Sequence, residues 1–231
     1  MLGFEESRKY YKNPEKTVVT GTPVRGEFGE YSKKTAKAEL GIPMDKPLVV
    51  SVWVSLGAEN MNEVMCSFIE LAGKKPGFML IHSAGVEGYE KMVTHLRDTV
   101  PDYEKNGMDV REYIYDMPRV MAAADLVLCR AGASTISELT YMHKPTIFVP
   151  SPFVTNNHQF KNAKVVEDAG GALIFEEGWF EPKELLKAVK DILSSADKIE
   201  KMSAAMAKLA KPGATDMICD RIFSLVEENG K

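Results

Sequence analysis

The chain has 231 residues, of which 45% are hydrophobic and 27% are charged, and its net charge is -4. This length suits one large α/β domain or two small ones, and the weak acidity argues against nucleic-acid binding, which needs a basic surface. No apolar run approaches the roughly 20 residues of a membrane-spanning helix, and the first residues lack the basic-then-apolar order of a signal peptide.

The cysteines indicate a reducing compartment. The chain has three cysteines, an odd number, at Cys66, Cys129 and Cys219. They are far apart in the sequence, and each lies in an apolar segment. We therefore expect reduced thiols in the core of a cytoplasmic protein, and the spacing contains no zinc motif.

Short apolar runs alternate with amphipathic stretches along the whole chain. We expect strands at residues 16–20, 47–55, 78–82, 109–114, 125–129, 146–149 and 172–175. We expect helices at 31–40, 59–72, 116–124, 181–194, 196–209 and 215–228, another within 85–99, and one that carries His158 and is stopped by Gly170-Gly171. This alternation predicts a doubly wound, Rossmann-like parallel sheet of the α/β class. The domain would span residues 17–231, after a polar linker over residues 1–16.

The stretch from Cys129 to Pro150 carries the most informative pattern: strand end, glycine turn, helix, strand. We expect Gly132 to adopt a backbone angle closed to other residues, and Ser134 or Thr135 to cap the helix. A helix that begins just after a strand directs unpaired N–H groups at the crevice where open α/β sheets bind diphosphates. Glu138, about one turn into this helix, is then either a ribose-binding carboxylate or a plain surface glutamate.

Two other turns would face the same crevice. Gly21-Thr-Pro-Val-Arg25 leaves Arg25 free either to enter the crevice or to pair with Glu27. Ser55-Leu-Gly-Ala58 joins the central strand to a helix and offers the Ser55 hydroxyl.

Several blocks of the sequence resemble the MurG family, and they occur in the family's order. They are Val19-Thr-Gly-Thr-Pro-Val-Arg25, Ser55-Leu-Gly-Ala58, Tyr113-Ile-Tyr-Asp-Met117, Cys129-Arg-Ala-Gly-Ala-Ser-Thr-Ile-Ser-Glu138, and Pro150 through His158-Gln159 to Asn162-Ala163. The likeness covers nearly the whole chain and corresponds to the carboxyl-terminal, nucleotide-sugar-binding half of the family. Members transfer N-acetylglucosamine from UDP-N-acetylglucosamine to lipid I, which gives lipid II for peptidoglycan, and consist of two facing Rossmann-like domains, the GT-B architecture.

The resemblance implies a donor site that uses neither a metal nor a cofactor. Ile114 would lie against the uracil. The backbone N–H groups of Ala133, Ser134 and Thr135 would bind the diphosphate, and Glu138 would accept hydrogen bonds from the ribose hydroxyls.

Four further residues would complete this site. Gln159, with His158 beside it, would bind the hydroxyls of the hexose, and Arg25 and Ser55 would reach the diphosphate. Arg25 would add the charge that favours departure of UDP. The chain departs from the family pattern at Trp53-Val54, where two glycines are usual, so the side chain of Val54 would crowd the approach to the diphosphate.

The family's acceptor loops, catalytic-base histidine and membrane-docking patch belong to its amino-terminal domain. Residues 1–16 resemble only the end of that domain, so no catalytic residue is assigned here. We expect inactivity without an acceptor-binding domain or subunit supplied separately. The protein would be cytoplasmic, and it would reach the lipid-linked acceptor and the inner face of the plasma membrane only through that partner.

Two alternatives remain open: an enzyme resembling UDP-N-acetylglucosamine epimerase, and a non-catalytic nucleotide-binding or partner-binding module, such as one subunit of a split transferase. Three histidines, His82, His95 and His143, have no acidic or serine partner visible in the sequence and are interpreted as structural.

Overall fold

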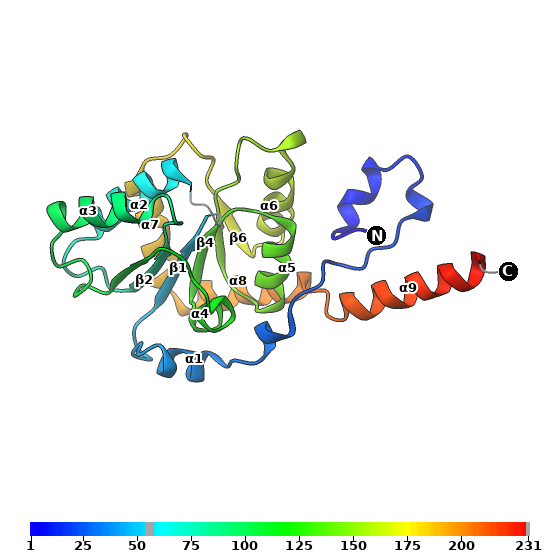
Figure 1. Cartoon of the computed structure of the whole chain (residues 1–231), viewed down its shortest axis with the longest axis horizontal. Coiled ribbons are helices and arrows are strands. Elements are labelled where there is room, and N and C mark those ends of the chain that lie inside the picture. The colour runs from blue at the N-terminus through cyan, green and yellow to red at the C-terminus, as the bar shows by residue number, and fades with distance from the viewer. Residues whose placement is uncertain (54–57, 230–231) are drawn as a thin grey trace.

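Over residues 1–53 and 58–229, which the computed structural model describes, six parallel strands form the centre of the molecule. The strands are β1 (Leu48–Val52), β2 (Met79–Ser83), β3 (Met108–Arg111), β4 (Leu126–Cys129), β5 (Thr146–Phe148) and β6 (Ala172–Ile174). Their order in the sheet is β3-β2-β1-β4-β5-β6 (Figure 1). The order reverses between β1 and β4, and this switch point is where open parallel sheets form ligand crevices. The predicted doubly wound sheet is confirmed.

Helices follow the strands and cover both faces of the sheet (Figure 1). They are α1 (Lys33–Glu39), α2 (Glu59–Ala72), α3 (Tyr89–Thr99), α4 (Met117–Ala123), α5 (Ala133–Tyr141), α6 (His158–Asp168), α7 (Pro182–Leu193), α8 (Ala196–Leu209) and α9 (Ala214–Asn229). Short 3-10 turns occur at Glu5–Tyr10, Pro14–Lys16, Gly26–Gly29 and Thr155–Asn157.

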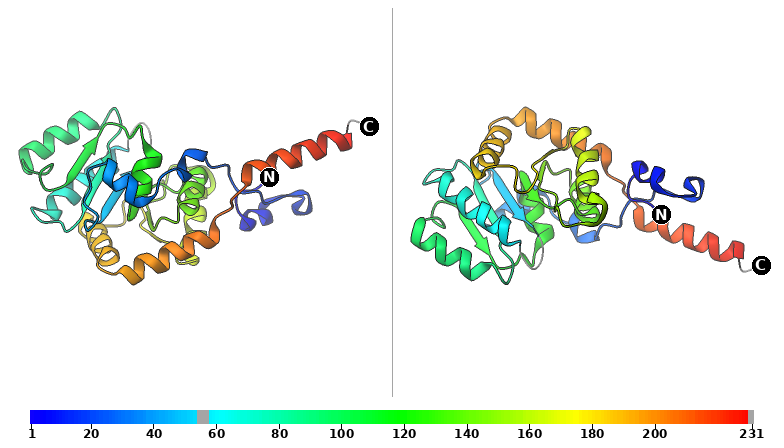
Figure 2. Two further views of the ribbon diagram at one scale, coloured as in Figure 1. Left: turned by 90° about the horizontal axis from the view of Figure 1, so that it is seen from below. Right: turned by 90° about the horizontal axis from the view of Figure 1, so that it is seen from above.

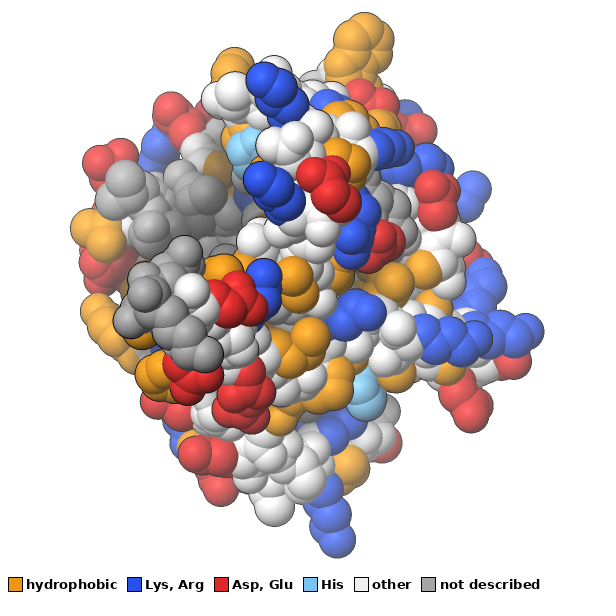
Figure 3. All heavy atoms as spheres, turned by 90° about the vertical axis from the view of Figure 1, so that its right-hand side faces the viewer, with side chains coloured by type: hydrophobic (Ala, Val, Ile, Leu, Met, Phe, Trp, Pro, Cys, Tyr) orange, Lys and Arg blue, Asp and Glu red, His pale blue; other side chains and the backbone are white. Residues whose placement is uncertain are grey.

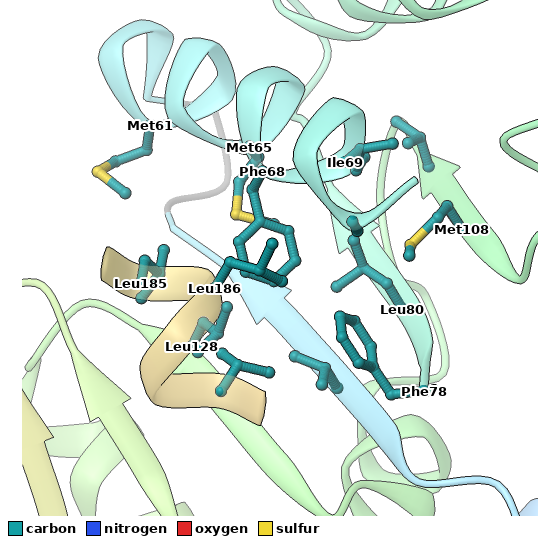
Figure 4. Close-up of a cluster of buried hydrophobic side chains, with 14 of the residues drawn as sticks. Met61, Met65, Phe68, Ile69, Phe78, Leu80, Met108, Leu128, Leu185 and Leu186 are labelled. Atoms are coloured by element: carbon teal, nitrogen blue, oxygen red, sulfur yellow. The ribbon is translucent and has the colours of Figure 1, made fainter. Parts of the chain in front are cut away.

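Two hydrophobic layers enclose the sheet because its strands are apolar on both faces. One layer packs α2, α3 and α7 against β1 and β2, with Met65, Phe68 and Leu185 fully buried between them (Figure 4). The other layer packs residues of α1, α4, α5 and α6 on the opposite face, around Val120 and Ile136. Methionines at helical spacing therefore fill core space in this protein.

Two expectations from the sequence are wrong. Residues 16–20 do not form a strand of the sheet, because Lys16 ends a 3-10 turn and Val19 makes only an isolated parallel bridge to Leu2. The thiol of Cys129 is buried as expected, but Cys66 is half-buried and Cys219 is exposed on α9. An apolar neighbourhood in the sequence does not distinguish a core helix from the face of a helix that lacks a partner.

The two ends of the chain lie on the same side of the molecule. The amino-terminal segment lies beside the start of α9, and α9 extends away from the body of the molecule (Figures 1 and 2). Within the described residues, no helix combines the length and the apolar character needed to span a membrane.

Candidate functional site at the carboxyl edge of the sheet

Three residues separate the end of β4 from the start of α5, at the switch point. Its N-cap is Gly132, and no side chain caps the helix. The first backbone amide with a partner in this turn is that of Ile136, which donates to the carbonyl of Gly132 at 2.9 Å. Ala133 and Ser134 are exposed and Thr135 is half-buried, so this turn presents amide donors at the crevice edge, as an anion site requires.

The predicted details of this turn need correction. Gly132 has φ -66° and ψ 146°, an extended conformation that any residue adopts, so its backbone is not in the glycine region. Ser134 and Thr135 lie inside the first turn of the helix, where neither hydroxyl acts as the N-cap. The absence of a side-chain cap leaves the amides without an internal acceptor, which suits an external anion better than the predicted cap does.

Glu138 lies half-buried in the same helix, and Arg25 is near it. Burial raises the pKa of the Glu138 carboxyl, and the charge of Arg25 opposes that rise. Arg25 also lies 3.6 Å from Glu27 (Nη1 to Oε2) and stacks over the ring of Phe28, 5.1 Å from the ring centroid. Arg25 therefore pairs with Glu27 and at the same time lies close enough to Glu138 for its charge to act on that carboxyl.

The turn before Arg25 has a specific need for glycine. Gly21 has φ +78°, and a Cβ at this position would lie 2.7 Å from the Cβ of Lys211. A side chain here would clash with the segment between α8 and α9, so the glycine fixes how the arginine-bearing turn packs.

The helix α6 brings its polar side chains to the loops of the crevice. Gln159 accepts a hydrogen bond from the backbone N–H of Ser151 through Oε1 at 2.9 Å. Asn162 donates to the carbonyl of Ala131 at 3.3 Å, which ties α6 to the turn before α5. His158 is exposed, and its Nδ1 lies 2.9 Å from the carbonyl of Thr155. The predicted sugar-reading residues thus lie next to the turn predicted to bind the diphosphate.

The remaining predicted residues have different positions. Ile114 is 2% exposed and belongs to the hydrophobic layer beneath the crevice, whereas the next residue, Tyr115, is 88% exposed. The Ile114 side chain therefore supports the site from below, with little surface of its own. Ser55 and Val54 lie outside the described residues.

The sequence did not point to a buried charged network at this edge. Arg130 donates to the carbonyl of Val149 at 2.9 Å, pairs with Glu177 at 2.6 Å and lies 6.0 Å from the ring centroid of Trp53. Asn60 on α2 also donates to Glu177, at 3.2 Å. This network joins the ends of β4 and β5, the segment after β6 and the first turn of α2. An arginine directly after a buried strand is the signal that would have suggested it.

A separate hollow of about 580 Å³ lies between α2 and α3, where Asn62, Cys66, Gly88 and Lys91 line it. Within residues 1–53 and 58–229, no residue that lines this hollow is a predicted donor-site residue. Among the residues that the structure describes, no group of three or more His, Cys, Asp or Glu side chains is placed to hold a metal ion.

Comparison with known proteins identifies the family of this domain. The glycosyltransferase family 28 C-terminal domain matches residues 49–218. The chain is 37% identical over 227 residues to the UDP-N-acetylglucosamine--N-acetylmuramyl-(pentapeptide) pyrophosphoryl-undecaprenol N-acetylglucosamine transferase of Acetivibrio thermocellus, covering 98% of this chain and 59% of the relative. A transferase of the same name from Thermoanaerobacter sp. is 38% identical over 224 residues, covering 97% of this chain and 61% of the relative.

Solved structures agree with this assignment. The crystal structure of Acinetobacter baumannii MurG superposes with a TM-score of 0.70 at 25% identity, covering 90% of this chain and 57% of that protein. A UDP complex of Staphylococcus aureus MnaA has a TM-score of 0.68 at 14% identity, covering 96% of this chain and 58% of that protein, a likeness of fold alone. The chain spans about three fifths of the length of the curated relatives named above. It belongs to the glycosyltransferase family 28 C-terminal domain family and corresponds to the carboxyl-terminal half of a MurG-like GT-B enzyme.

Proposed function

We propose that this domain binds UDP-N-acetylglucosamine as the donor half of an N-acetylglucosaminyltransferase that makes lipid II. The observation that carries the proposal is the uncapped first turn of α5, with the half-buried Glu138 one turn further on and Arg25 close to that carboxylate. The free amides suit a diphosphate, and the carboxylate suits a ribose that lies beside it.

The residues of α6 support the choice of sugar. Gln159 uses its Oε1 atom on the loop after β5, which leaves its amide N–H₂ group as the donor for a hexose hydroxyl. His158, in the exposed first turn, stands beside it for a second polar contact. Uracil would lie over the segment around Ile114, where backbone groups and the exposed Tyr115 offer contacts that the buried isoleucine side chain does not.

The chemistry of transfer divides between two halves of the enzyme. An acceptor hydroxyl loses its proton to a base and forms the new bond to the anomeric carbon. The bond from that carbon to the diphosphate oxygen breaks, and UDP departs with the bonding electrons. On this chain, the amides of α5 and the guanidinium of Arg25 would stabilise the charge that develops on UDP, and the base would come from the acceptor-binding half.

Two surfaces of this chain support a second, acceptor-binding domain. Leu2 and Val19 form an isolated parallel bridge, although parallel strands normally occur in sheets covered on both faces. The helix α9, whose start lies beside the amino-terminal segment, exposes Ile222, Phe223 and Val226. Figure 3 views the molecule from this side and shows hydrophobic side chains interspersed with Lys and Arg side chains. Residues 1–16 would belong to the edge of the acceptor-binding domain, and any contact with the membrane and the lipid-linked acceptor would pass through that domain.

Reconstitution tests the proposal. The chain would be mixed with the amino-terminal part of the Acetivibrio thermocellus transferase, with a lipid I analogue and UDP-N-acetylglucosamine, and the products would be identified by mass spectrometry. We expect acceptor-dependent release of UDP and a disaccharide product only when both halves are present. Release of an epimerised sugar from this chain alone would contradict the transferase proposal and favour the epimerase. Donor binding without any turnover in the mixture would favour the non-catalytic module.

A further inference from the structure

The turn between β4 and α5 is tied to the elements on either side of it. Arg130, the first residue after β4, donates through Nη1 to the carbonyl of Val149 at 2.9 Å, and the N–H of Val149 donates to the carbonyl of Cys129 at 2.9 Å. The next carbonyl, that of Ala131, accepts from Asn162 of α6 at 3.3 Å. Each of the three residues that precede the N-cap of α5 is therefore tied to another part of the chain.

Glu177 keeps the Arg130 side chain in this position. This residue belongs to the segment after β6, and its Oε2 lies 2.6 Å from Arg130 Nη1, with 10% of the arginine side chain and 9% of the glutamate side chain exposed. Its other oxygen, Oε1, accepts from Asn60 of α2 at 3.2 Å. A buried ion pair adds little net stability, because desolvation offsets the attraction between the charges, but removal of one partner is costly. The pair therefore holds the guanidinium in one place.

Trp53 packs against the same guanidinium. Its side chain is buried, and its ring centroid lies 6.0 Å from Arg130 Cζ. The indole N–H has no hydrogen-bond partner within the described part of the chain, so the contribution of Trp53 to this network is the ring itself. Glycine, which is usual at this position in the MurG family, would leave the guanidinium without this contact.

The path of this turn sets the direction of the first amides of α5. The first hydrogen bond of the helix runs from the N–H of Ile136 to the carbonyl of Gly132, the residue directly after the tied segment. Glu138 lies further along, in the part of α5 that the buried side chains of Ile136 and Leu139 anchor in the core. Loss of the ties would therefore loosen the first turn and leave Glu138 in place.

We infer that Glu177 is a positioning residue for the diphosphate subsite of the donor, and that it acts through Arg130. The ion pair sets the path of the turn, and the turn aims the α5 amides at the diphosphate. This inference rests on the proposed donor binding and deepens it, because it names two residues outside the ligand contacts on which recognition of the diphosphate depends.

Calorimetric titration with UDP and with uridine tests the inference, because only UDP carries the diphosphate. Arg130→Met keeps a long side chain without its hydrogen bonds, and we expect UDP affinity to fall tenfold to about a hundredfold, the scale of a group misplaced by about an ångström. Glu177→Gln should lower UDP affinity several-fold, because a neutral amide holds the guanidinium less firmly than a carboxylate does. In both variants uridine affinity should stay within about twofold of wild type.

The double variant Arg130→Met with Glu177→Gln separates position from charge. It removes the ion pair but leaves the two side chains neutral in sum, as in wild type. We expect it to bind UDP about as weakly as Arg130→Met alone, because Glu177 acts only through Arg130. If charge alone matters, Glu177→Gln strengthens UDP binding and the double variant regains wild-type affinity, and either result would overturn the inference. Glu177→Gln also carries the test by itself if Arg130→Met does not fold.

Val189→Ala is the matched control for lost stability, because Val189 is fully buried on α7, in the layer that contains Trp53, and has no polar group. It should lower the melting temperature and leave the ratio of UDP to uridine affinity unchanged. The inference fails if Val189→Ala changes this ratio as the Arg130 and Glu177 variants do.

Amide hydrogen exchange, followed by NMR, tests the geometry without any ligand. The N–H of Met142 donates to the carbonyl of Glu138 at 3.0 Å, at the other end of α5, and serves as the internal reference. The N–H of Ile136 should exchange faster relative to this reference in Arg130→Met and in Glu177→Gln, because the first turn opens more often. A ratio of the two exchange rates equal to that of wild type would overturn the inference. Failure of the wild-type protein to bind UDP would instead contradict the proposed function.

Discussion

At the scale of single residues, the proposed contact between Glu138 and the ribose of the donor can be tested by substitution. Glu138→Ala should weaken UDP binding by about 1–3 kcal/mol, the cost of losing a charged hydrogen-bond partner. Glu138→Gln should show most of the same loss, because the amide accepts more weakly than the carboxylate. Glu90→Gln removes an exposed carboxylate of α3 and serves as the control, with unchanged affinity expected in the same titration. Wild-type affinity in a folded Glu138→Ala variant would remove the ribose assignment.

Gln159 allows a sharper substitution than deletion of its side chain. Gln159→Glu keeps the oxygen that accepts from Ser151 but replaces the amide donor with an acceptor. We expect this variant to lose its preference for UDP-N-acetylglucosamine over UDP-N-acetylgalactosamine, measured by competition, while UDP alone binds as before. An equal loss for all three ligands would show that the residue supports the loop and does not read the hexose.

Residue types and order predicted the position of the α5 turn, but not its details. Glycine in a strand-to-helix turn suggested a left-handed backbone, whereas Gly132 is extended. The serine and threonine suggested a cap, because these residues are the commonest N-caps. The network around Arg130 and the buried contact between His82 and Ser51 join residues distant in the sequence, so no local pattern could have shown these partners.

At the scale of elements, α1 is joined to the sheet by charge. Asp125, at the start of β4, pairs with Lys33 and Lys37 of α1, at 2.9 Å to Lys37, and accepts from the N–H of Leu48 at 2.8 Å. Asp125→Asn should lower the free energy of unfolding by about 3–5 kcal/mol, because Lys37 would remain buried without a counter-charge. Urea denaturation measures this change, and Asp98→Asn on the exposed side of α3 is the control.

The contacts of Asp125 also predict that the stability of the protein depends on pH. Burial acts to raise the pKa of Asp125, but hydrogen bonds from Lys33, the Leu48 N–H and Lys37 outweigh it and lower the pKa below 3.8. The unfolded chain therefore binds the proton first, and the stabilisation is present above pH 3.8 and is lost as the pH falls through the folded value. Asp125→Asn should remove this part of the acid sensitivity; an unchanged profile would show that other carboxylates are responsible.

Periodicity predicted most elements well, because each is long and strongly amphipathic or continuously apolar. The helix predicted at residues 59–72 matches α2 at both ends. The segment at residues 16–20 has the composition of a strand, but its pairing partner decides its structure, and here that partner is only Leu2. Strand composition is local information, whereas pairing is a property of the fold.

At the scale of the whole molecule, α9 is the feature that the domain itself does not explain. Phe223 and Val226 are 66% and 63% exposed on a helix that extends from the body (Figure 2). Large exposed apolar side chains on one face indicate an interaction surface. Phe223→Ser with Val226→Ser should therefore reduce turnover in the reconstituted mixture without changing the titration with UDP. Glu227→Ser, on the same helix, is the control and should leave both unchanged.

The central claim is that this domain by itself recognises the donor. The most direct test is calorimetric titration of the purified chain with UDP-N-acetylglucosamine, UDP-N-acetylgalactosamine and UDP. The account predicts saturable binding of all three at one site, with UDP-N-acetylglucosamine preferred over its epimer. If none of the three ligands binds, the claim that this domain by itself recognises the donor is contradicted.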